Sequence, residues 1–400
     1  MRRPFSMTRT ILVLTVAVFA ILTATAQKCS YLGLKSAGQA AYCIDRKDRV
    51  AYIRDFGGSA DAREQIPHLL EKWDEAHVNK LVINCSHPHL DHMGGLIELA
   101  SDRANFYTPD GLRFGNGIYV IDRDPKNTLP ALLRRTLGSN EKVHHLPAGN
   151  RNAFSAVSAI DGDVFMMNIP YEVPSRTDSP SKRVTSHVHD SAVVTLTVLS
   201  RKCTILDLDD ASTEAIKRVA SELRKRSNIR EFDAVIISHH GSKNNDNGPL
   251  LDAFQFRKVV FAVNEDNRFG HPDTTVVVQA IKKVGAGNVL FTGSDDAIEF
   301  DPTGVKFVYS ATNAAGFRAF ILPNLLRASS EDREFLRELD PTRDTQRPKF
   351  QIESQPNKDT KSELSTWAKT WEAVIEYARK LQDDMRDSIK EEGGPAKVVK

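Results

Sequence analysis

The sequence predicts a layered α/β sandwich, and two patterns carry that prediction. Short β-patterned runs follow one another between residues 30 and 56, whereas from residue 192 onwards apolar strand-like runs alternate with helix-like segments. A meander of strands followed by alternating strands and helices favours a layered sandwich over an all-parallel, doubly wound sheet.

The elements are expected in a definite order along the chain. Strands at 31–34, 41–44 and 50–53 are followed by a helix at 62–77 and a buried strand at 81–84. Strand and loop then alternate over 103–160 around a helical patch at 132–137, and 164–167 is another apolar run. After a Ser/Pro/Arg-rich loop at 173–186, strands are expected at 192–198, 203–208, 234–237, 258–263 and 289–291, with helices at 212–226, 248–255 and 273–283.

The N-terminal segment differs from the rest of the chain. Arg2, Arg3 and Arg9 precede an apolar run at 11–22 and a small-residue cleavage site, Ala24-Thr25-Ala26. This order predicts a secretory signal peptide over 1–26, and therefore a periplasmic or secreted protein. An uncut membrane anchor is the alternative, and no other stretch is long and apolar enough to cross a bilayer.

The folded body is expected over 27–330, a charged linker over 331–362 and an amphipathic helix over 363–392. The helix either packs on the protein's own body or forms a dimer or partner-binding surface. Its apolar stripe has three- and four-residue spacing: Leu364, Trp367, Trp371, Val374, Ala378, Leu381 and Met385.

Charge and cysteine content narrow the class of protein. Removing residues 1–26 takes three of the 54 basic residues and none of the 52 acidic ones, which leaves a net charge near −1. This balance argues against nonspecific binding of long nucleic acid and leaves small or short substrates open.

Cys29 and Cys43 lie on neighbouring early strands and could form a disulfide, whereas Cys85 and Cys203 are expected to be buried apolar side chains.

The segment His87-Pro88-His89-Leu90-Asp91-His92 directly follows the strand at 81–84. Residues two apart in an extended segment face the same way, so His87 and His89 can bind one ion. Asp91 and His92 can serve a second ion where the chain turns into a helix. Imidazole and carboxylate suit Zn²⁺, with Mn²⁺ as the alternative, so we predict a metal site rather than a solvated turn.

Further ligands are expected where later strands begin or end. His189 precedes the strand at 192–198, and Asp210, with Asp209 in reserve, follows the strand at 203–208, where a carboxylate could bridge two ions. His239 and His240 follow the strand at 234–237; one is expected to bind the second ion and the other to contact substrate. Four other histidines lack a companion acid at useful spacing and are expected to be structural or on the surface: His68, His77, His144 and His145.

These motifs resemble the metallo-β-lactamase superfamily, and more closely the hydrolase domain of the ComEC competence proteins and the secreted phosphorylcholine esterases. The resemblance spans about residues 30–325 and implies an αββα fold with a two-metal site at one edge, with His240 as a ligand and His239 polarising the substrate. Besides the His-rich motif and the strand-end Asp, it rests on His239-His240-Gly241-Ser242-Lys243, Ala37-Gly38-Gln39-Ala40-Ala41, Asp55-Phe56-Gly57-Gly58 and Gly270-His271-Pro272. Two positions depart from it: Asp209 and Ala40 stand where Gly is usual.

From this site we expect an exported hydrolase with two Zn²⁺ or Mn²⁺ ions. A water shared by the ions is the expected nucleophile, with Asp91 or Asp210 as proton acceptor and His239 stabilising the transition state. His271 is expected to face the substrate, and the segment 239–243, with Lys243 and Arg268 near enough in sequence to meet a phosphate, favours a phosphodiester in nucleic-acid fragments or surface polymers. Hydrolysis of a lactone or β-lactam at the same site, and a non-catalytic binding protein, are the alternatives.

Overall fold

The computed structural model describes residues 28–35, 38–122, 124, 126–138, 142–147, 163–171, 188–265, 269–294, 296–341, 372–373 and 376–377. The predicted signal peptide, residues 342–362 of the predicted linker and most of the predicted C-terminal helix lie outside these ranges. None of the helices within them has the length and apolar character that crossing a bilayer requires.

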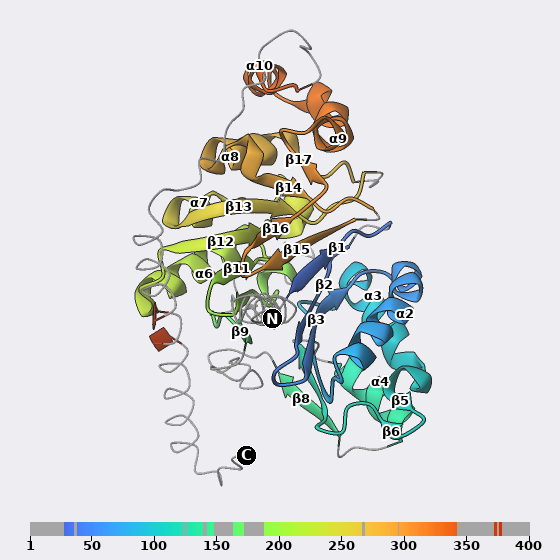
Figure 1. Ribbon diagram of the computed structural model, residues 1–400. Helices are drawn as coiled ribbons and strands as arrows, with labels where there is room; N and C mark the ends of the chain where they lie inside the picture. The colour runs from blue at the N-terminus through green and yellow to red at the C-terminus, as the bar shows by residue number, and fades with distance from the viewer. Residues whose placement is uncertain are drawn as a thin grey trace, which may run out of the picture.

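Two mixed β-sheets form the centre of the molecule (Figure 1). The first sheet has the strand order β16 (Gly304–Lys306), β15 (Ala297–Asp301), β1 (Cys29–Leu32), β2 (Ala40–Asp45), β3 (Val50–Phe56), β4 (Lys80–Asn84), β7 (Ile118–Asp122) and β8 (Val143–Pro147). The second has the order β17 (Tyr309–Ser310), β14 (Val289–Phe291), β13 (Gln255–Phe261), β12 (Glu231–Ile236), β11 (Cys203–Asp207), β10 (Thr195–Leu199) and β9 (Val164–Asn168).

Helices cover the outer face of each sheet (Figure 1). On the first sheet lie α2 (Ser59–Glu75), α3 (Leu90–Ser101) and α4 (Thr128–Leu137). On the second lie α6 (Thr213–Arg226), α7 (Gly248–Ala253) and α8 (Thr274–Val284), and α10 (Ser330–Glu338) packs against α8. The predicted αββα sandwich is therefore confirmed. Shorter elements join these layers: β5 (Tyr107–Thr108), β6 (Gly111–Leu112), α9 (Ala314–Gly316) and five single-turn helices, η1 (Arg103–Phe106), η2 (Ser238–Gly241), η3 (Ala286–Asn288), η4 (Phe317–Ile321) and η5 (Leu322–Arg327).

Three apolar clusters correspond to the three interfaces between the layers. Successive residues of a strand face opposite sides of its sheet, so Leu81 and Ile83 pack under α2–α4 while Val82 packs between the sheets. In the second sheet Val235 packs under the outer helices, whereas Ile236 faces the first sheet. Each such fully buried aliphatic side chain contributes roughly 1.5–3 kcal/mol, and strands buried on both faces explain the unbroken apolar runs in the sequence.

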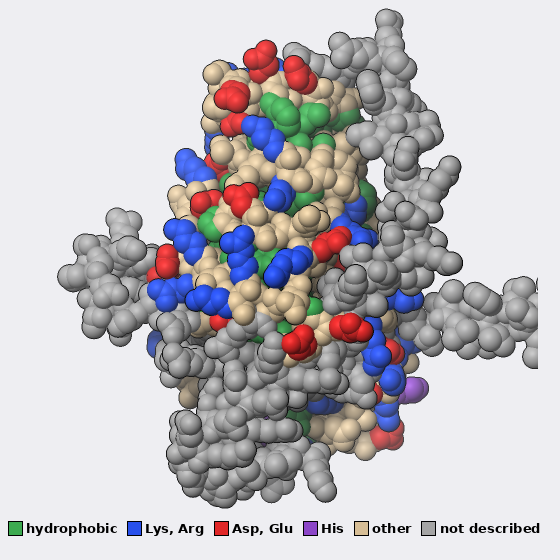
Figure 2. Space-filling view, turned by 90° about the vertical axis from the view of Figure 1, so that its left-hand side faces the viewer, with side chains coloured by type: hydrophobic (Ala, Val, Ile, Leu, Met, Phe, Trp, Pro, Cys, Tyr) green, Lys and Arg blue, Asp and Glu red, His purple; other side chains and the backbone are tan. Residues whose placement is uncertain are grey.

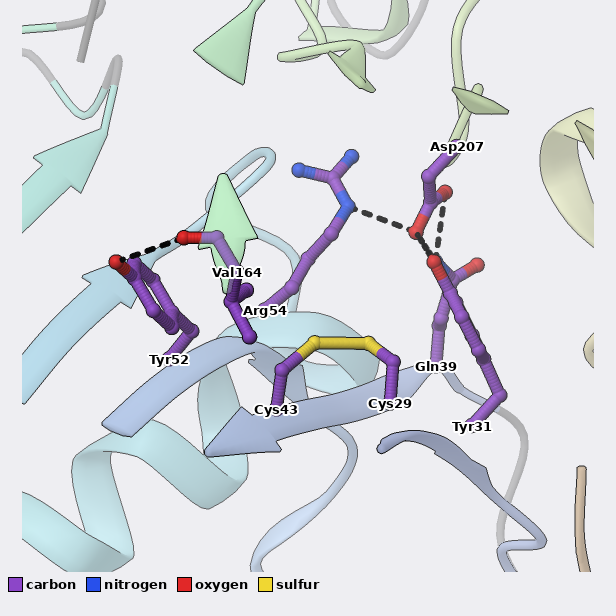
Figure 3. The surroundings of a disulfide bond; sticks show 8 residues. All are labelled: Cys29, Tyr31, Gln39, Cys43, Tyr52, Arg54, Val164 and Asp207. Atoms are coloured by element: carbon purple, nitrogen blue, oxygen red, sulfur yellow. Dashed lines mark hydrogen bonds and ion pairs between the residues drawn. A yellow bond between two sulfur atoms is a disulfide. The ribbon is translucent and has the colours of Figure 1, made fainter. Parts of the chain in front are cut away.

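The predicted disulfide is confirmed. Cys29 of β1 and Cys43 of β2 are directly opposite each other in an antiparallel pair, with their Cα atoms 4.3 Å apart (Figure 3). Cys85 and Cys203 are free thiols, and both are buried as expected. The disulfide therefore fixes the first strand of the described chain to the sheet that carries the His-rich motif.

The last elements of the body were not predicted. β15 pairs antiparallel with β1. The chain therefore returns from the second sheet to the edge of the first. Strands of two to five residues carry little periodic pattern, and β15 and β17 pair with strands elsewhere in the sequence, so local patterns did not indicate them.

The predicted start of the linker at residue 331 is wrong. Residues 330–338 form α10, which begins at Ser329, whose side chain accepts a hydrogen bond from Asp332 N. Leu336 of α10 is fully buried in the outer cluster of the second sheet. Ala373 and Tyr377 join the same cluster, whereas the residues of the predicted apolar stripe lie outside the described ranges. The charged outer face of α10 explains why its sequence resembles a linker.

Candidate metal centre

The predicted ligands converge at one edge of the sandwich, between the two sheets. The His-rich motif follows β4 of the first sheet, and the other ligands lie at the ends of strands of the second sheet. Backbone hydrogen bonds join these segments: Val193 N donates to Ser86 O at 3.0 Å and His239 N donates to Asp209 O at 2.8 Å. Ligands from distant parts of the sequence are thus held together by the main chain.

A close backbone approach holds the start of α3. His89 is the last extended residue before this helix, with φ −84° and ψ 149°. Gly95 N donates to Gly57 O at 2.8 Å, and a Cβ on Gly95 would lie only 1.9 Å from Phe56 O. Glycine therefore allows α3 to press against the loop after β3, which sets the position of Asp91 and His92.

The first ligand group contains His87, His89, His189 and Asp210, whose ligand atoms all lie within 4.8 Å of one another. His87 Nε2 is 3.0 Å from His89 Nδ1 and 3.7 Å from Asp210 Oδ2. His189 Nε2 is also 3.7 Å from Asp210 Oδ2. Three imidazoles and one carboxylate oxygen form a donor set suited to Zn²⁺.

The second ligand group contains Asp91, His92 and His240, with the same maximal spacing of 4.8 Å. His92 Nε2 is 3.9 Å from Asp91 Oδ2 and 3.5 Å from Asp210 Oδ1. His240 Nε2 is 3.7 Å from the same Asp210 oxygen. Asp210 therefore directs one oxygen to each group, which is the geometry of a carboxylate shared by two cations.

Four buried polar atoms at this centre have no hydrogen-bond partner among the described residues: His92 Nε2, His189 Nε2, His240 Nε2 and Asp210 Oδ1. A buried polar atom left unpaired costs roughly 1–3 kcal/mol. Three unpaired imidazole nitrogens around the unpaired oxygen of one carboxylate are accounted for if cations occupy the space between them. The residues present thus fit a pair of divalent metal ions.

Hydrogen bonds at the opposite ring nitrogen orient these imidazoles. His240 Nδ1 donates to Ala262 O at 2.8 Å, and His92 Nδ1 lies 3.1 Å from Asp55 Oδ2. His87 Nδ1 lies 3.1 Å from Asp209 Oδ1. A proton held at Nδ1 leaves the Nε2 lone pair directed at the centre, where it can bind a metal.

The electrostatics of the centre are set by burial and by its carboxylates. Burial lowers the pKa of His189 to about 4, so its ring is neutral and ready to bind a cation at neutral pH. Burial also opposes charge on His92, but the carboxylates of Asp209 and Asp210 outweigh it and raise the pKa of His92 well above its usual range. Burial, together with the charge of Asp209, raises the pKa of Asp55 to about 7. A metal bound at His92 would replace the proton there.

His239 is the more exposed of the two adjacent histidines of η2. Its Nε2 is 3.8 Å from Asp210 Oδ2, its Nδ1 is 2.9 Å from Asn245 Oδ1, and its side chain is 26% exposed. The His271 ring lies 5.9 Å from the His239 ring, and burial lowers the pKa of His271 to about 4. Among the described residues no hydrogen bond or ion pair joins the exposed Lys243 to the centre, and Arg268 lies outside those residues.

Sequence reasoning gave no role to the buried Arg54 and Asp207, and it named the buried Asp55 and Gln39 only as parts of motifs that carry the family resemblance. The available signal was a charged residue inside or at the end of an apolar strand, as Arg54 is in β3. His145 is half-buried, and its Nε2 lies 3.0 Å from Asp122 Oδ1, an acid 23 positions away in the sequence. His68, His77 and His144 are exposed, as expected.

Comparison with known proteins finds solved structures whose chains are arranged similarly. No protein-family model and no curated protein matches the sequence. Among solved structures, the chain is similar to the metallo-β-lactamase fold protein YhfI from Bacillus subtilis, with 11% identity, a TM-score of 0.35, and coverage of 67% of this chain and 87% of that one. An isothiocyanate hydrolase from Delia radicum gut bacteria has 13% identity, a TM-score of 0.38, and coverage of 68% and 99%. Human tRNase Z, short form, has 10% identity, a TM-score of 0.34, and coverage of 68% and 98%. We draw no functional inference from these likenesses.

Proposed function

We propose that this protein is a metal-dependent hydrolase of the metallo-β-lactamase superfamily that cleaves phosphodiesters outside the cytoplasm. The observation that carries the proposal is Asp210, whose two oxygens face two separate groups of ligands. Two divalent ions held there, with Zn²⁺ expected first and Mn²⁺ second, would acidify a water and offset negative charge on a substrate oxygen.

The chain's own residues supply the remaining functions. Asp91, with a side chain that is 37% exposed, lies beside His92 of the second group, where it can accept a proton from an attacking water. In its doubly protonated form His239 can polarise the substrate, with Nδ1 donating to Asn245 Oδ1 and Nε2 donating to a substrate oxygen. His271 stands beside His239, where it can contact the substrate.

Two further features support the finer parts of the proposal. The Cys29–Cys43 disulfide is typical of proteins that act in an oxidising compartment, which supports export. On the face shown in Figure 2, Lys and Arg side chains are interspersed with Asp and Glu rather than forming a continuous basic surface. Such a surface supports a small substrate, or a short stretch of a polymer, over extended nucleic acid.

Metal content is the first test. Purified protein, residues 27–400, is expected to contain two equivalents of metal by plasma mass spectrometry. Asp91→Ala and His189→Ala should each retain about one equivalent, because each removes a ligand from one group, and Asp210→Ala should retain neither. The exposed Asp110→Ala is the matched control and should keep two. Two equivalents of metal in Asp210→Ala would overturn the assignment of Asp210 as a ligand shared by both groups.

The substrate class is tested with the same proteins. Metal-loaded wild type is expected to hydrolyse bis-p-nitrophenyl phosphate, short DNA or phosphorylcholine esters, and His239→Ala should lose about 100-fold or more in kcat while keeping both metals. Hydrolysis of a lactone or β-lactam with all phosphodiesters untouched would favour the alternative reaction. Two bound metals with no hydrolysis of any of these substrates would favour a binding protein.

A further inference from the structure

Arg54 is an arginine buried between the two sheets directly beneath the metal centre. It belongs to β3, its side chain is 1% exposed, and its neighbours Asp55, Asp207 and Asp209 are also buried. A buried guanidinium is costly unless its donors are paired, so an arginine in this place has to be held by a specific set of acceptors.

The contacts of Arg54 cross from the first sheet to the second. Its Nε donates to Asp207 Oδ2 at 2.9 Å, and its Nη2 lies 3.4 Å from Asp209 Oδ2 and 2.5 Å from Val193 O. Its Nη1 donates to Thr195 Oγ1. Figure 3 shows the Arg54 side chain reaching Asp207, which also accepts hydrogen bonds from Gln39 and Tyr31. One side chain thus ties β3 to β10 and β11.

Asp209 connects Arg54 to the ligand histidines. The second carboxylate oxygen of Asp209, Oδ1, lies 3.1 Å from His87 Nδ1 and 3.3 Å from His92 Nδ1. His87 belongs to the first ligand group and His92 to the second. A shift of Asp209 would therefore rotate one imidazole of each group away from Asp210.

We propose that Arg54 is a positioning residue for both metal positions. It holds Asp209 against His87 and His92, and it fixes the ligands contributed by the two sheets relative to one another. The proposal rests on the metal centre proposed above. Lysine cannot replace arginine in this role, because a single ammonium group cannot serve acceptors spread over two strands.

Cobalt binding tests the proposal. Apo wild type, Arg54→Lys and the control Arg63→Lys are titrated with Co²⁺, with visible absorption reporting ligand geometry and circular dichroism reporting the fold. Arg63 makes an exposed ion pair with Glu98 at 2.7 Å, so its variant should match wild type. Arg54→Lys should weaken binding at both positions by about 10- to 100-fold and change the Co²⁺ spectrum at saturation, with the circular dichroism unchanged.

The outcomes separate this inference from the proposed function. If wild type binds no Co²⁺, the metal centre itself is refuted. If wild type binds two equivalents and Arg54→Lys binds them with the same affinity and spectrum, only the role of Arg54 is overturned. If Arg54→Lys does not fold, Asp207→Asn takes its place, since it preserves shape and removes the principal ion pair of Arg54. Unchanged Co²⁺ affinity in Asp207→Asn then overturns the proposal.

Discussion

Asp209 and Asp210 are adjacent, equally buried and chemically identical, yet their carboxylates face different partners. Asp210 faces the Nε2 atoms of the ligand histidines, whereas Asp209 faces the Nδ1 atoms of two of them. Asp209 has φ 51°, a left-handed conformation that glycine adopts freely and aspartate tolerates better than most residues. This conformation directs the carboxylates of the two adjacent residues at different partners, so that Asp210 and not Asp209 faces both ligand groups.

A residue far from the centre gives a test of pH dependence. Burial raises the pKa of Asp233 to about 6, against about 3.8 in an unfolded chain. The folded protein binds this proton more tightly, so Asp233 reduces stability as pH rises from about 4 to 6. Relative to wild type, Asp233→Asn should therefore gain up to about 3 kcal/mol in the free energy of unfolding over that interval.

Urea denaturation at pH 4.5 and pH 7 measures this difference. The exposed Asp252→Asn is the control, and its stability relative to wild type should stay constant within about 0.5 kcal/mol. A difference between Asp233→Asn and wild type that does not change with pH would contradict the prediction.

At the scale of elements, the site depends on where strands and helices begin and end. The ligands follow strand ends or precede a strand, and the short element η2 directs two consecutive histidines at the two oxygens of Asp210 because both have positive φ, 51° and 56°. Helix α3 contributes Asp91 and His92 from its first turn. Small displacements of these elements are therefore expected to alter metal binding before they unfold the protein.

Gly95→Ala tests the packing of α3. The added Cβ meets the backbone oxygen of Phe56, so α3 must shift outward. We expect a loss of about 1–3 kcal/mol in unfolding free energy, measured by denaturation, together with weaker binding at the second metal position. Gly115→Ala is the control, because nothing lies within 4 Å of its added Cβ. Equal stability of the two variants would show that the α3 contact is not tight.

The link between β1 and β2 can be tested through the disulfide. It closes a loop with a sequence separation of 14 residues, and a loop of about 15 residues predicts a contribution near 3 kcal/mol. The double variant Cys29→Ala/Cys43→Ala should lose roughly that amount in urea denaturation. Dithiothreitol should lower wild type to the level of the variant and leave the variant unchanged; an effect on both would point to another thiol.

At the scale of the whole molecule, the ligands come from both sheets, so metal binding joins the two halves of the sandwich. Metal at 100 times its dissociation constant should raise the free energy of unfolding by about 2.7 kcal/mol or more. Thermal denaturation with excess Zn²⁺ and with a chelator measures the effect, and Asp210→Ala should show none. An identical melting temperature in both conditions would argue that the two sheets do not share a metal centre.

Local patterns were sufficient for much of this architecture. The apolar strands, the principal helices, the disulfide pair and a layered α/β sandwich follow from hydrophobic periodicity and the order of the elements, whereas the αββα arrangement was implied by the family resemblance. The short strands β15–β17 and helix α10 were missed, because the strands are too short to show a period and because β15, β17 and α10 pack on elements elsewhere in the sequence. Sequence reasoning named the residues that meet at the candidate centre, but it gave no role to Arg54 and no partner to Asp55, because their neighbours depend on tertiary packing.

The amino-acid sequence by itself determined which chemical groups are available: histidines and carboxylates at strand ends, two cysteines at opposing positions, and strands apolar on both faces. Only the tertiary structure decided which oxygen of Asp210 faces which histidines, and that Asp209 and Arg54 lie behind the ligands. The physical reason is the distance along the chain over which each property is set. Periodicity and turns are local properties of the chain, whereas orientation at a buried centre is set by contacts between residues that lie more than a hundred positions apart.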